Sequence, residues 1–416
     1  MDQFSTEKLT ISINRLLRRL YELAEIGAHK DGGTTRISLT DDDKRGRDLV
    51  VQWMEDLGLE VRIDRIGNVF GIRKGTTDEK PVVIGSHVDT VVRAGIYDGS
   101  LGVLAGLEVV EVLNENNHVT TRPVVVAFFT NEEGVRFQPD MMGSLVFAGG
   151  YPLQDALNSR ATDDGTTLKE NLERIGYYGS APAGQFPIEV FIEFHVEQGP
   201  VLDAEGITIG VVKGAQGISW TEYRITGVQN HAGTTPMAYR KDAGYVAAEI
   251  IKYTRDLVME MGENQVSTVG MVDLCPNLIN VIAEHANIVV DLRNTDGKSL
   301  REAEQKVSGF AEKIARKEGV RIVKKALVRL DPVPFDEEIV QKLHTKAKSM
   351  GFSVKKMWSG AGHDAQLIAR VFPAAMIFIP SKDGISHNAK EYSSPEDIEK
   401  GANLLLQVVL ELARQA

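Results

Sequence analysis

Four short apolar runs between residues 81 and 379 constrain the fold of this chain most strongly. They read PVVIG at 81–85, VVVAFF at 124–129, VFIEF at 190–194 and AAMIFI at 374–379. Strands that are apolar along their whole length are typical of a sheet with both faces buried, and helical patterns such as 100–113 separate these runs. The sequence therefore predicts an α/β fold in which helices sandwich the sheet.

The stretch from residue 214 to residue 328 has a different pattern. Its predicted strands and helices, which follow the order β-α-β-β-α-β, include 220–227, 242–261, 266–273, 286–294 and 300–318. This order is typical of a ferredoxin-like α+β domain. We therefore predict that 214–328 is an inserted domain, and that 1–213 and 329–416 together form the domain into which it is inserted.

Charge and composition exclude several classes of protein. The 47 basic and 58 acidic residues give a net charge of −11, and no cluster of Lys and Arg forms the basic stripe of a nucleic-acid-binding protein. Apolar stretches such as 124–129 are far shorter than the roughly 20 residues that span a bilayer. The start, MDQF, lacks the features of a signal peptide, and the one cysteine, Cys275, excludes an intramolecular disulfide. We expect a cytoplasmic protein with no nucleic-acid or membrane partner.

Several histidines and carboxylates come directly after predicted strands. In open α/β sheets, ligands bind just beyond the carboxyl ends of the strands. The candidates are His87, Asp98, Glu132, Glu133, His195 and His387. A mixed nitrogen and oxygen ligand set suits Zn²⁺, Mn²⁺ or Co²⁺ and needs no thiolate. Even five of these six residues would overfill one catalytic ion, whereas two ions that share a carboxylate would leave a place for water. Asp89, two residues after His87, is expected to accept a hydrogen bond from that imidazole.

Each of these residues also has a simpler interpretation. A single histidine at a strand end is more often a surface residue, Glu132 and Glu133 resemble a solvated acidic pair, and Asp98 before a glycine is typical of a turn or helix cap. Their joint occurrence at several strand ends favours the metal site. The sequence also favours a buried structural thiol for Cys275, and simple turns remain an alternative for 360–362.

The motifs around these residues resemble a known family. The blocks GSHVDT (85–90), YDG (97–99) and NEEG (131–134) are similar to those of binuclear aminoacylase- and carboxypeptidase-like metallohydrolases. Four further blocks resemble one amidase branch, which contains N-carbamoyl-L-amino acid hydrolases, β-ureidopropionases and allantoate amidohydrolases. These are FHVEQGP (194–200), HAGTTPM (231–237), SGAGHDA (359–365) and GISH (384–387). The blocks occur in order from about residue 30 to about residue 400.

The resemblance implies a zinc-exopeptidase-like mixed sheet, an inserted lid and dimerisation domain, a homodimer, and two divalent ions (Zn, Mn, Co or Ni) per subunit. It implies that one ion is bound by His87, Asp98 and His195 and the other by Asp98, Glu133 and His387, with Glu132 as general base. The implied substrate contacts are Gln198, His231, Asn280, Arg293, Gly360, Ala361 and Gly362. In the family the histidine corresponding to His231 reaches the partner subunit's site. Two departures, Ala283 and Asn388, touch no ligand.

The resulting hypothesis is a metal-dependent amidohydrolase that cleaves N-carbamoyl-L-amino acids, which are small ureido substrates with a carboxylate, to amino acid, CO₂ and ammonia. Allantoate amidohydrolase and β-ureidopropionase are the close alternatives. An aminopeptidase or dipeptidase fits the amidase blocks less well, and a non-catalytic binding module would be expected to have lost a ligand or the base. Arg293 could grip the substrate carboxylate with its guanidinium or, alternatively, form a surface ion pair with Asp291 or Asp296. His231 could donate to the oxyanion.

Overall fold

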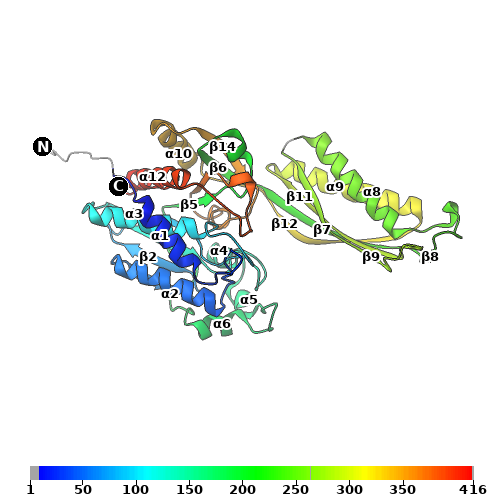
Figure 1. The fold of residues 1–416 in the computed structure, drawn as a ribbon, viewed down its shortest axis with the longest axis horizontal. Helices are drawn as coiled ribbons and strands as arrows, with labels where there is room; N and C mark the ends of the chain where they lie inside the picture. Colours follow the sequence, from blue (N-terminus) through cyan, green and yellow to red (C-terminus); the bar gives the residue numbers. More distant parts are fainter. Residues whose placement is uncertain (1–8, 263, 415–416) are drawn as a thin grey trace. The chain divides into compact units, whose positions relative to one another are not determined.

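The computed structural model describes residues 9–262 and 264–414, and the chain divides into two compact units (Figure 1). One unit comprises the chain up to Gly214 and from Pro334 onward, and the other comprises Ala215–Val333. Each unit has a hydrophobic core of its own. The second unit extends past the predicted end at residue 328, because its last long strand runs to Leu330.

The first unit contains a mixed sheet of nine strands among the described residues, as the predicted fold class requires. Its order is β1-β2-β4-β3-β5-β15-β6-β13, and β14 pairs with β6. The strands are β1 (Glu60–Ile63), β2 (Val69–Arg73), β3 (Val82–His87), β4 (Val124–Phe129), β5 (Val190–Val196), β6 (Ile209–Ala215), β13 (Val333–Pro334), β14 (Val354–Ser359) and β15 (Ala374–Ile379). The neighbours β4, β3, β5 and β15 are parallel, whereas β2 and β6 pair with this group antiparallel. These four parallel strands are the four apolar runs of the sequence, and every position in them is buried.

Helices cover both faces of this sheet. They are α1 (Ile13–Ala24), α2 (Asp41–Asp56), α3 (Ser100–Glu115), α4 (Met142–Phe147), α5 (Leu153–Asn158), α6 (Leu168–Ile175), α7 (Val201–Glu205), α10 (Glu337–Ser349), α11 (Asp364–Ile368) and α12 (Pro395–Leu412), with a short 3-10 turn at Lys382–Gly384. Gly401 of α12 lies against the ring of Phe194, while the neighbouring strand residue, Glu193, accepts the N–H of Ala365 in α11. Because successive side chains of a strand point to opposite faces, α12 and α11 lie on opposite sides of β5.

The second unit has the predicted β-α-β-β-α-β order. Its main elements are β7 (Gly217–Thr226), α8 (Ala243–Met261), β9 (Val266–Cys275), β11 (His285–Asn294), α9 (Gly297–Glu318) and β12 (Arg321–Leu330). The four strands form an antiparallel sheet in the order β12-β7-β11-β9, which is the ferredoxin-like arrangement. Helices α8 and α9 pack together, with the rings of Tyr253 and Phe310 stacked at 4.0 Å. A short pair, β8 (Asn230–His231) and β10 (Val281–Ile282), and a 3-10 turn at Met237–Tyr239 complete this unit.

One sequence-based expectation about this unit is wrong. Cys275 is not a buried thiol but an exposed residue at the end of β9. β9 is an edge strand of the sheet, so its side chains lack the neighbours on one side that would bury them. Among the described residues, no helix has both the length and the apolar character needed to cross a membrane.

Candidate metal centre

The predicted site residues of the first unit lie in the loops at one edge of its sheet. His87 is the last residue of β3, His195 lies near the end of β5, and Glu132 and Glu133 follow β4. His387 follows β15 after a short loop. Because these four strands are parallel and adjacent, their carboxyl ends meet at the same edge, which is where the sequence places the site.

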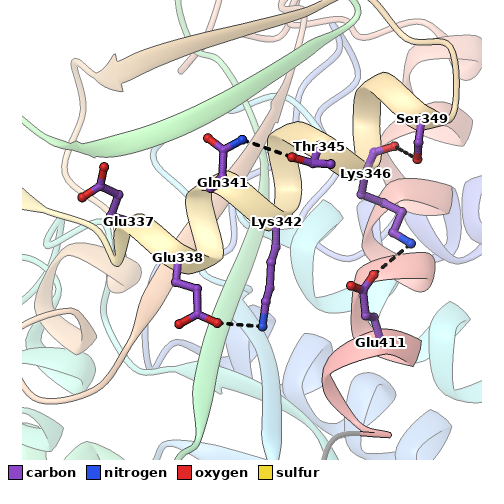
Figure 2. A pocket seen from close by; sticks show the side chains of 8 residues that line it. All are labelled: Glu337, Glu338, Gln341, Lys342, Thr345, Lys346, Ser349 and Glu411. Carbon is purple, nitrogen blue, oxygen red and sulfur yellow. Dashed lines mark hydrogen bonds and ion pairs between the residues drawn. The ribbon is translucent and has the colours of Figure 1, made fainter.

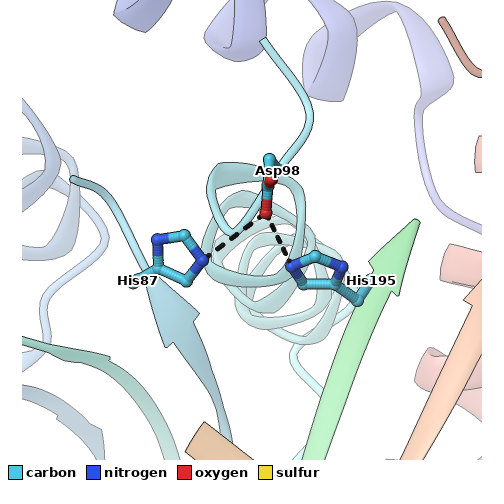
Figure 3. A group of neighbouring side chains, drawn as sticks. All are labelled: His87, Asp98 and His195. Atoms are coloured by element: carbon cyan, nitrogen blue, oxygen red, sulfur yellow. Dashed lines mark ion pairs between the residues drawn. The ribbon is translucent and has the colours of Figure 1, made fainter. Parts of the chain in front are cut away.

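Two imidazoles and one carboxylate form the first cluster. Nε2 of His87 lies 3.6 Å from Oδ1 of Asp98, and Nε2 of His195 lies 3.1 Å from the same oxygen. Figure 3 shows that both rings, which extend from two strands, are directed at this oxygen. Asp98 itself lies on the loop before α3. All three side chains are buried. Gly99 makes the approach possible, because a Cβ there would lie 2.4 Å from the ring of His87.

The hydrogen bonds of Nδ1 identify the tautomers of His87 and His195. Nδ1 of His87 lies 2.9 Å from the carbonyl oxygen of Asp89, and Nδ1 of His195 lies 2.9 Å from that of Val196. A carbonyl only accepts, so Nδ1 carries the hydrogen in both rings and Nε2 of the neutral ring presents a lone pair. The lone pairs therefore face the Asp98 carboxylate, and His195 Nε2 also accepts the N–H of Gly99. A buried set of converging nitrogen and oxygen acceptors fits a divalent cation.

The second cluster uses the other oxygen of Asp98. Nε2 of His387 lies 3.3 Å from Oδ2 of Asp98 and 3.4 Å from Oε2 of Glu133. These residues form another group whose ligand atoms lie close enough to hold an ion. Asp98 thus directs one oxygen to each cluster, which is the geometry that a carboxylate shared by two ions requires. His387 is the exposed member, with 51% of its side chain accessible to solvent.

Mutual interactions shift the pKa values of these groups strongly. Without a metal ion, the rings of His195, His387 and His87 can take up a second proton and donate it to Asp98; these hydrogen bonds outweigh the effect of burial and hold the pKa of Asp98 well below the ordinary value. Hydrogen bonding with Asp98 is the main cause that raises the pKa of His387 to about 9, against the effect of burial. Such strongly perturbed groups in one place are typical of functional sites.

Glu132 is suited to proton transfer. It is almost fully buried, and its Oε2 lies 3.5 Å from Nε2 of His87. Burial raises its pKa well above the ordinary value, with help from the charges of Glu133 and Asp364 and against that of His87. Burial and the charge of Asp98 likewise raise the pKa of Glu133 to about 8. A bound cation would lower both pKa values, because it favours the charged carboxylates.

Asp89 takes a different position from the one predicted. The imidazole of His87 donates to the backbone carbonyl of Asp89, and the carboxylate oxygen of Asp89 lies 3.9 Å from the ring nitrogen. The carboxylate instead accepts the backbone N–H groups of Glu132 and Glu133, each at 3.3 Å. Asp89 therefore orients His87 through its main chain and holds the Glu132–Glu133 loop through its side chain.

Gln198 and the 360–362 loop also belong to the first unit. Gln198 has a left-handed backbone (φ 57°), and its amide donates to Oδ2 of Asp98 at 2.9 Å, so its side chain lies at the second cluster. Gly360, Ala361 and Gly362 follow β14, where Ser359 Oγ donates to the carbonyl of Ala361. The simple turn that the sequence allowed is thus held by a local hydrogen bond.

The remaining predicted site residues lie in the second unit. His231 pairs with Val281 across β8 and β10, and the carbonyl of Asn280 accepts the N–H of Ala232. Nδ1 of His231 accepts the N–H of Gly233, which places the ring hydrogen on Nε2. Arg293, on β11, forms an ion pair with Asp291 at 2.9 Å, which is the alternative that the sequence left open.

Sequence reasoning missed several buried polar residues below the clusters. Glu193 and His363 form a third potential ligand group with His195. The ring of His363 packs edge-on against that of His195 with centroids 4.6 Å apart, and burial holds its pKa well below the ordinary value, so it stays neutral. Asp364 accepts a hydrogen bond from Ser144. The SGAGHDA block contains His363 and Asp364, so this motif was the available signal.

A polar groove lies elsewhere, along the outer side of α10 (Figure 2). Four of its charged groups form two ion pairs, Lys342 with Glu338 and Lys346 with Glu411. It contains no histidine or cysteine. The groove therefore offers no comparable catalytic set, and the chemistry belongs to the clusters at the sheet edge.

An α/β sheet with His, Asp and Glu gathered at its carboxyl edge fits a metal-dependent hydrolase. Comparison with known proteins identifies the family: residues 83–411 match peptidase family M20/M25/M40. The chain belongs to this family, which confirms the family predicted from its motifs. It is an amidohydrolase that acts on C–N bonds.

Three relatives place the chain within the family. It is 40% identical to an N-carbamoyl-L-amino-acid amidohydrolase of Rhizobium meliloti over 408 residues, which cover 98% of each chain. It is 34% identical to the allantoate amidohydrolase of Bacillus subtilis (strain 168), over 98% of this chain and 100% of that one. The crystal structure of an amidase of the hydantoinase/carbamoylase family from Burkholderia multivorans matches with a TM-score of 0.94 and 42% identity, over 98% and 99% of the two chains.

Proposed function

We propose that this chain hydrolyses N-carbamoyl-L-amino acids with two divalent ions bound at the sheet edge. His87, Asp98 and His195 would hold one ion, and Asp98, Glu133 and His387 the other. The placement of the two Asp98 oxygens, one in each cluster, carries the assignment of two ions. The proposed substrate is supported by the 40% identity to a relative named for N-carbamoyl-L-amino acids. Zn²⁺, Mn²⁺, Co²⁺ and Ni²⁺ all accept such nitrogen and oxygen ligands.

The chain's own residues would divide the work of hydrolysis. When bound, the ions would polarise the ureido carbonyl and make water more acidic. Glu132 accepts the proton of the attacking water and delivers it to the departing nitrogen. Asp89 keeps Glu132 in place through the backbone N–H groups that it binds. Cleavage of the carbamoyl C–N bond yields the amino acid and carbamate, which decomposes to CO₂ and ammonia.

The second unit would supply the substrate contacts. We propose that Arg293 grips the substrate carboxylate in place of Asp291, because a guanidinium forms two parallel hydrogen bonds with a carboxylate. Asn280, Gln198 and the 360–362 loop are proposed to contact the ureido group. His231, with its hydrogen on Nε2, is suited to donate to the oxyanion that forms at the attacked carbonyl.

We further propose a homodimer in which His231 serves the partner subunit. An exposed edge strand supports the dimer: β9 carries partly apolar exposed side chains, including Val266, Val272 and Leu274. Mixing His231→Ala with Glu132→Gln under conditions of subunit exchange tests the arrangement. A mixed dimer has one site with both native residues, so activity should return in part. No recovery despite measured exchange would show that His231 acts in its own chain or has no role.

Substrate preference is tested directly with a panel. Ammonia and amino-acid release would be measured from N-carbamoyl-L-amino acids, β-ureidopropionate, allantoate and dipeptides, with Glu132→Gln as the control for contaminating activity. Allantoate is the second candidate, because it also presents a ureido group beside a carboxylate and a relative named for it is 34% identical. Preferred cleavage of allantoate would replace the main proposal, and activity on dipeptides alone would overturn it.

A further inference from the structure

A buried carboxylate that the proposed mechanism does not use lies next to the second cluster. Glu391 is only 6% exposed and follows His387 by four residues. One of its oxygens, Oε1, accepts the backbone N–H groups of Tyr97 and Asp98, each at 3.2 Å. The other, Oε2, accepts the hydroxyl of Ser386 at 2.8 Å. Glu391 thus joins two loops that are almost 300 residues apart in sequence and that each carry a proposed metal ligand.

The local backbone is built to admit this carboxylate. A Cβ on Gly95 would lie 2.4 Å from Oε1 and 2.5 Å from the Cβ of Glu391, so a larger residue there would force the two loops apart. The loop that carries Glu391 is also closed on itself, because the N–H of Glu391 donates to the carbonyl of Asn388 at 2.9 Å. Movement of Glu391 is therefore transmitted directly to the residues on either side of His387.

The two clusters depend on this link to different degrees. In the first cluster, the Asp98 loop is also held by the N–H of Gly99, which donates to Nε2 of His195 at 3.0 Å, and by the start of α3 at Ser100. In the second cluster, His387 is half exposed and lies on the loop that Glu391 fastens. Weakening the link should therefore separate His387 from Asp98 more than it separates Asp98 from His87 and His195.

We propose that Glu391 is a positioning residue that sets the distance between Asp98 and His387 and so controls binding of the ion at the second cluster. This inference rests on the proposed assignment of two ions. Outer residues that orient metal ligands typically change metal affinity by about 10- to 100-fold when they are removed. Glu391→Ala should therefore lower the affinity for the ion at Asp98, Glu133 and His387 by about tenfold or more. The affinity for the other ion should change little.

The test is calorimetric titration of the metal-free protein with Mn²⁺, supported by amide hydrogen exchange without metal. Wild type is expected to bind two ions, and Glu391→Ala to lose affinity at one. Exchange of the Tyr97 and Asp98 amides should accelerate in this variant. Glu391→Gln should keep most of the affinity, because its amide oxygen can accept the two N–H groups and its NH₂ can donate to Ser386 Oγ. Glu108→Ala is the matched control, since Glu108 is also buried and accepts a backbone N–H, from Ser12, but lies away from the clusters.

Several results would overturn the inference. One is an equal loss of affinity for both ions in Glu391→Ala. Another is unchanged affinity for both ions together with unchanged exchange of the Tyr97 and Asp98 amides. A third is a loss of affinity in Glu391→Gln as large as in Glu391→Ala, which would assign the effect to charge. If Glu391→Ala does not fold, Ser386→Ala removes one hydrogen bond of the same link and should weaken the same ion to a smaller extent; unchanged affinity would reject the link. If wild type binds a single ion, the two-ion assignment fails, and amide exchange alone decides whether Glu391 fastens the Asp98 loop.

Discussion

Replacing Glu132 with glutamine tests the proposed chemistry most directly. The amide has the shape of the carboxylate, so the side chain should remain in its buried position 3.5 Å from His87, and the backbone N–H should stay bonded to Asp89. What the variant loses is the ability to accept a proton. Because Glu132 is in neither proposed ligand set, the ions should remain bound.

The size of the effect follows from the role of a positioned general base. Such a group contributes about 10²- to 10⁴-fold to the rate, which corresponds to roughly 3–5 kcal/mol in the activation barrier. The neighbouring carboxylate of Glu133 cannot replace it, because Oε2 of Glu133 is directed at His387 in the other cluster. We therefore expect kcat of Glu132→Gln to fall by at least about 10²-fold.

The assay combines steady-state ammonia release from an N-carbamoyl-L-amino acid with metal analysis of the same preparation. Glu133→Gln provides the contrast, since it removes a ligand of the second cluster and should lose metal as well as activity. A Glu132→Gln enzyme with full metal content and a kcat close to wild type would refute the assignment of the base. Loss of metal in Glu132→Gln, with retention in Glu133→Gln, would require exchanging the two roles.

Three further predictions concern the ions, the substrate and the loop after β4. Without metal, the raised pKa values of Glu133 (about 8) and His387 (about 9) mean that the folded state binds protons more tightly than the unfolded state. Tm measured in a chelator should therefore fall as pH rises from about 5 to about 9, and added Mn²⁺ or Zn²⁺ should reverse the trend. A Tm that rises with pH in the chelator would contradict this prediction. Arg293→Lys should raise KM for carboxylate-bearing substrates, because a point charge cannot reproduce the two-pronged contact, and an unchanged KM would remove Arg293 from the site. Asp89→Asn should leave one buried N–H of the Glu132–Glu133 loop without an acceptor and lower stability by about 1–3 kcal/mol, which denaturant unfolding of the metal-free variant would measure; unchanged stability would show that these bonds contribute little.

Much of the architecture could be predicted because it depends on local patterns. Fully apolar runs gave four parallel strands, and the order of elements gave the ferredoxin-like sheet of the second unit. The convergence of His87, His195 and His387 also followed, since residues after parallel strands share an edge. What no local pattern indicates is that β15 pairs with β5, with Ala374 opposite Phe191, across the intervening unit. That pairing brings the loop of His387 and Glu391 to Asp98.

The function of individual atoms was less predictable, as Asp89 shows. The two-residue spacing correctly placed Asp89 beside His87, but the contact is made by the carbonyl rather than by the carboxylate. The carboxylate instead accepts the two backbone N–H groups of the loop after β4. Only the folded loop shows that these two donors are available to the carboxylate.

Backbone conformation adds a feature that the sequence conceals. Three non-glycine residues near the clusters, Asn131, Gln198 and His387, have left-handed φ values of 57°, 57° and 52°. Each such residue costs on the order of 1 kcal/mol or more relative to a right-handed conformation. Glycine would avoid that cost, but it would remove the Asn131 amide that binds the carbonyl of Phe137, the Gln198 amide on Asp98 and the proposed ligand His387. At these positions the side chain is needed where the backbone favours glycine, which is the pattern expected when local stability is exchanged for the placement of functional groups.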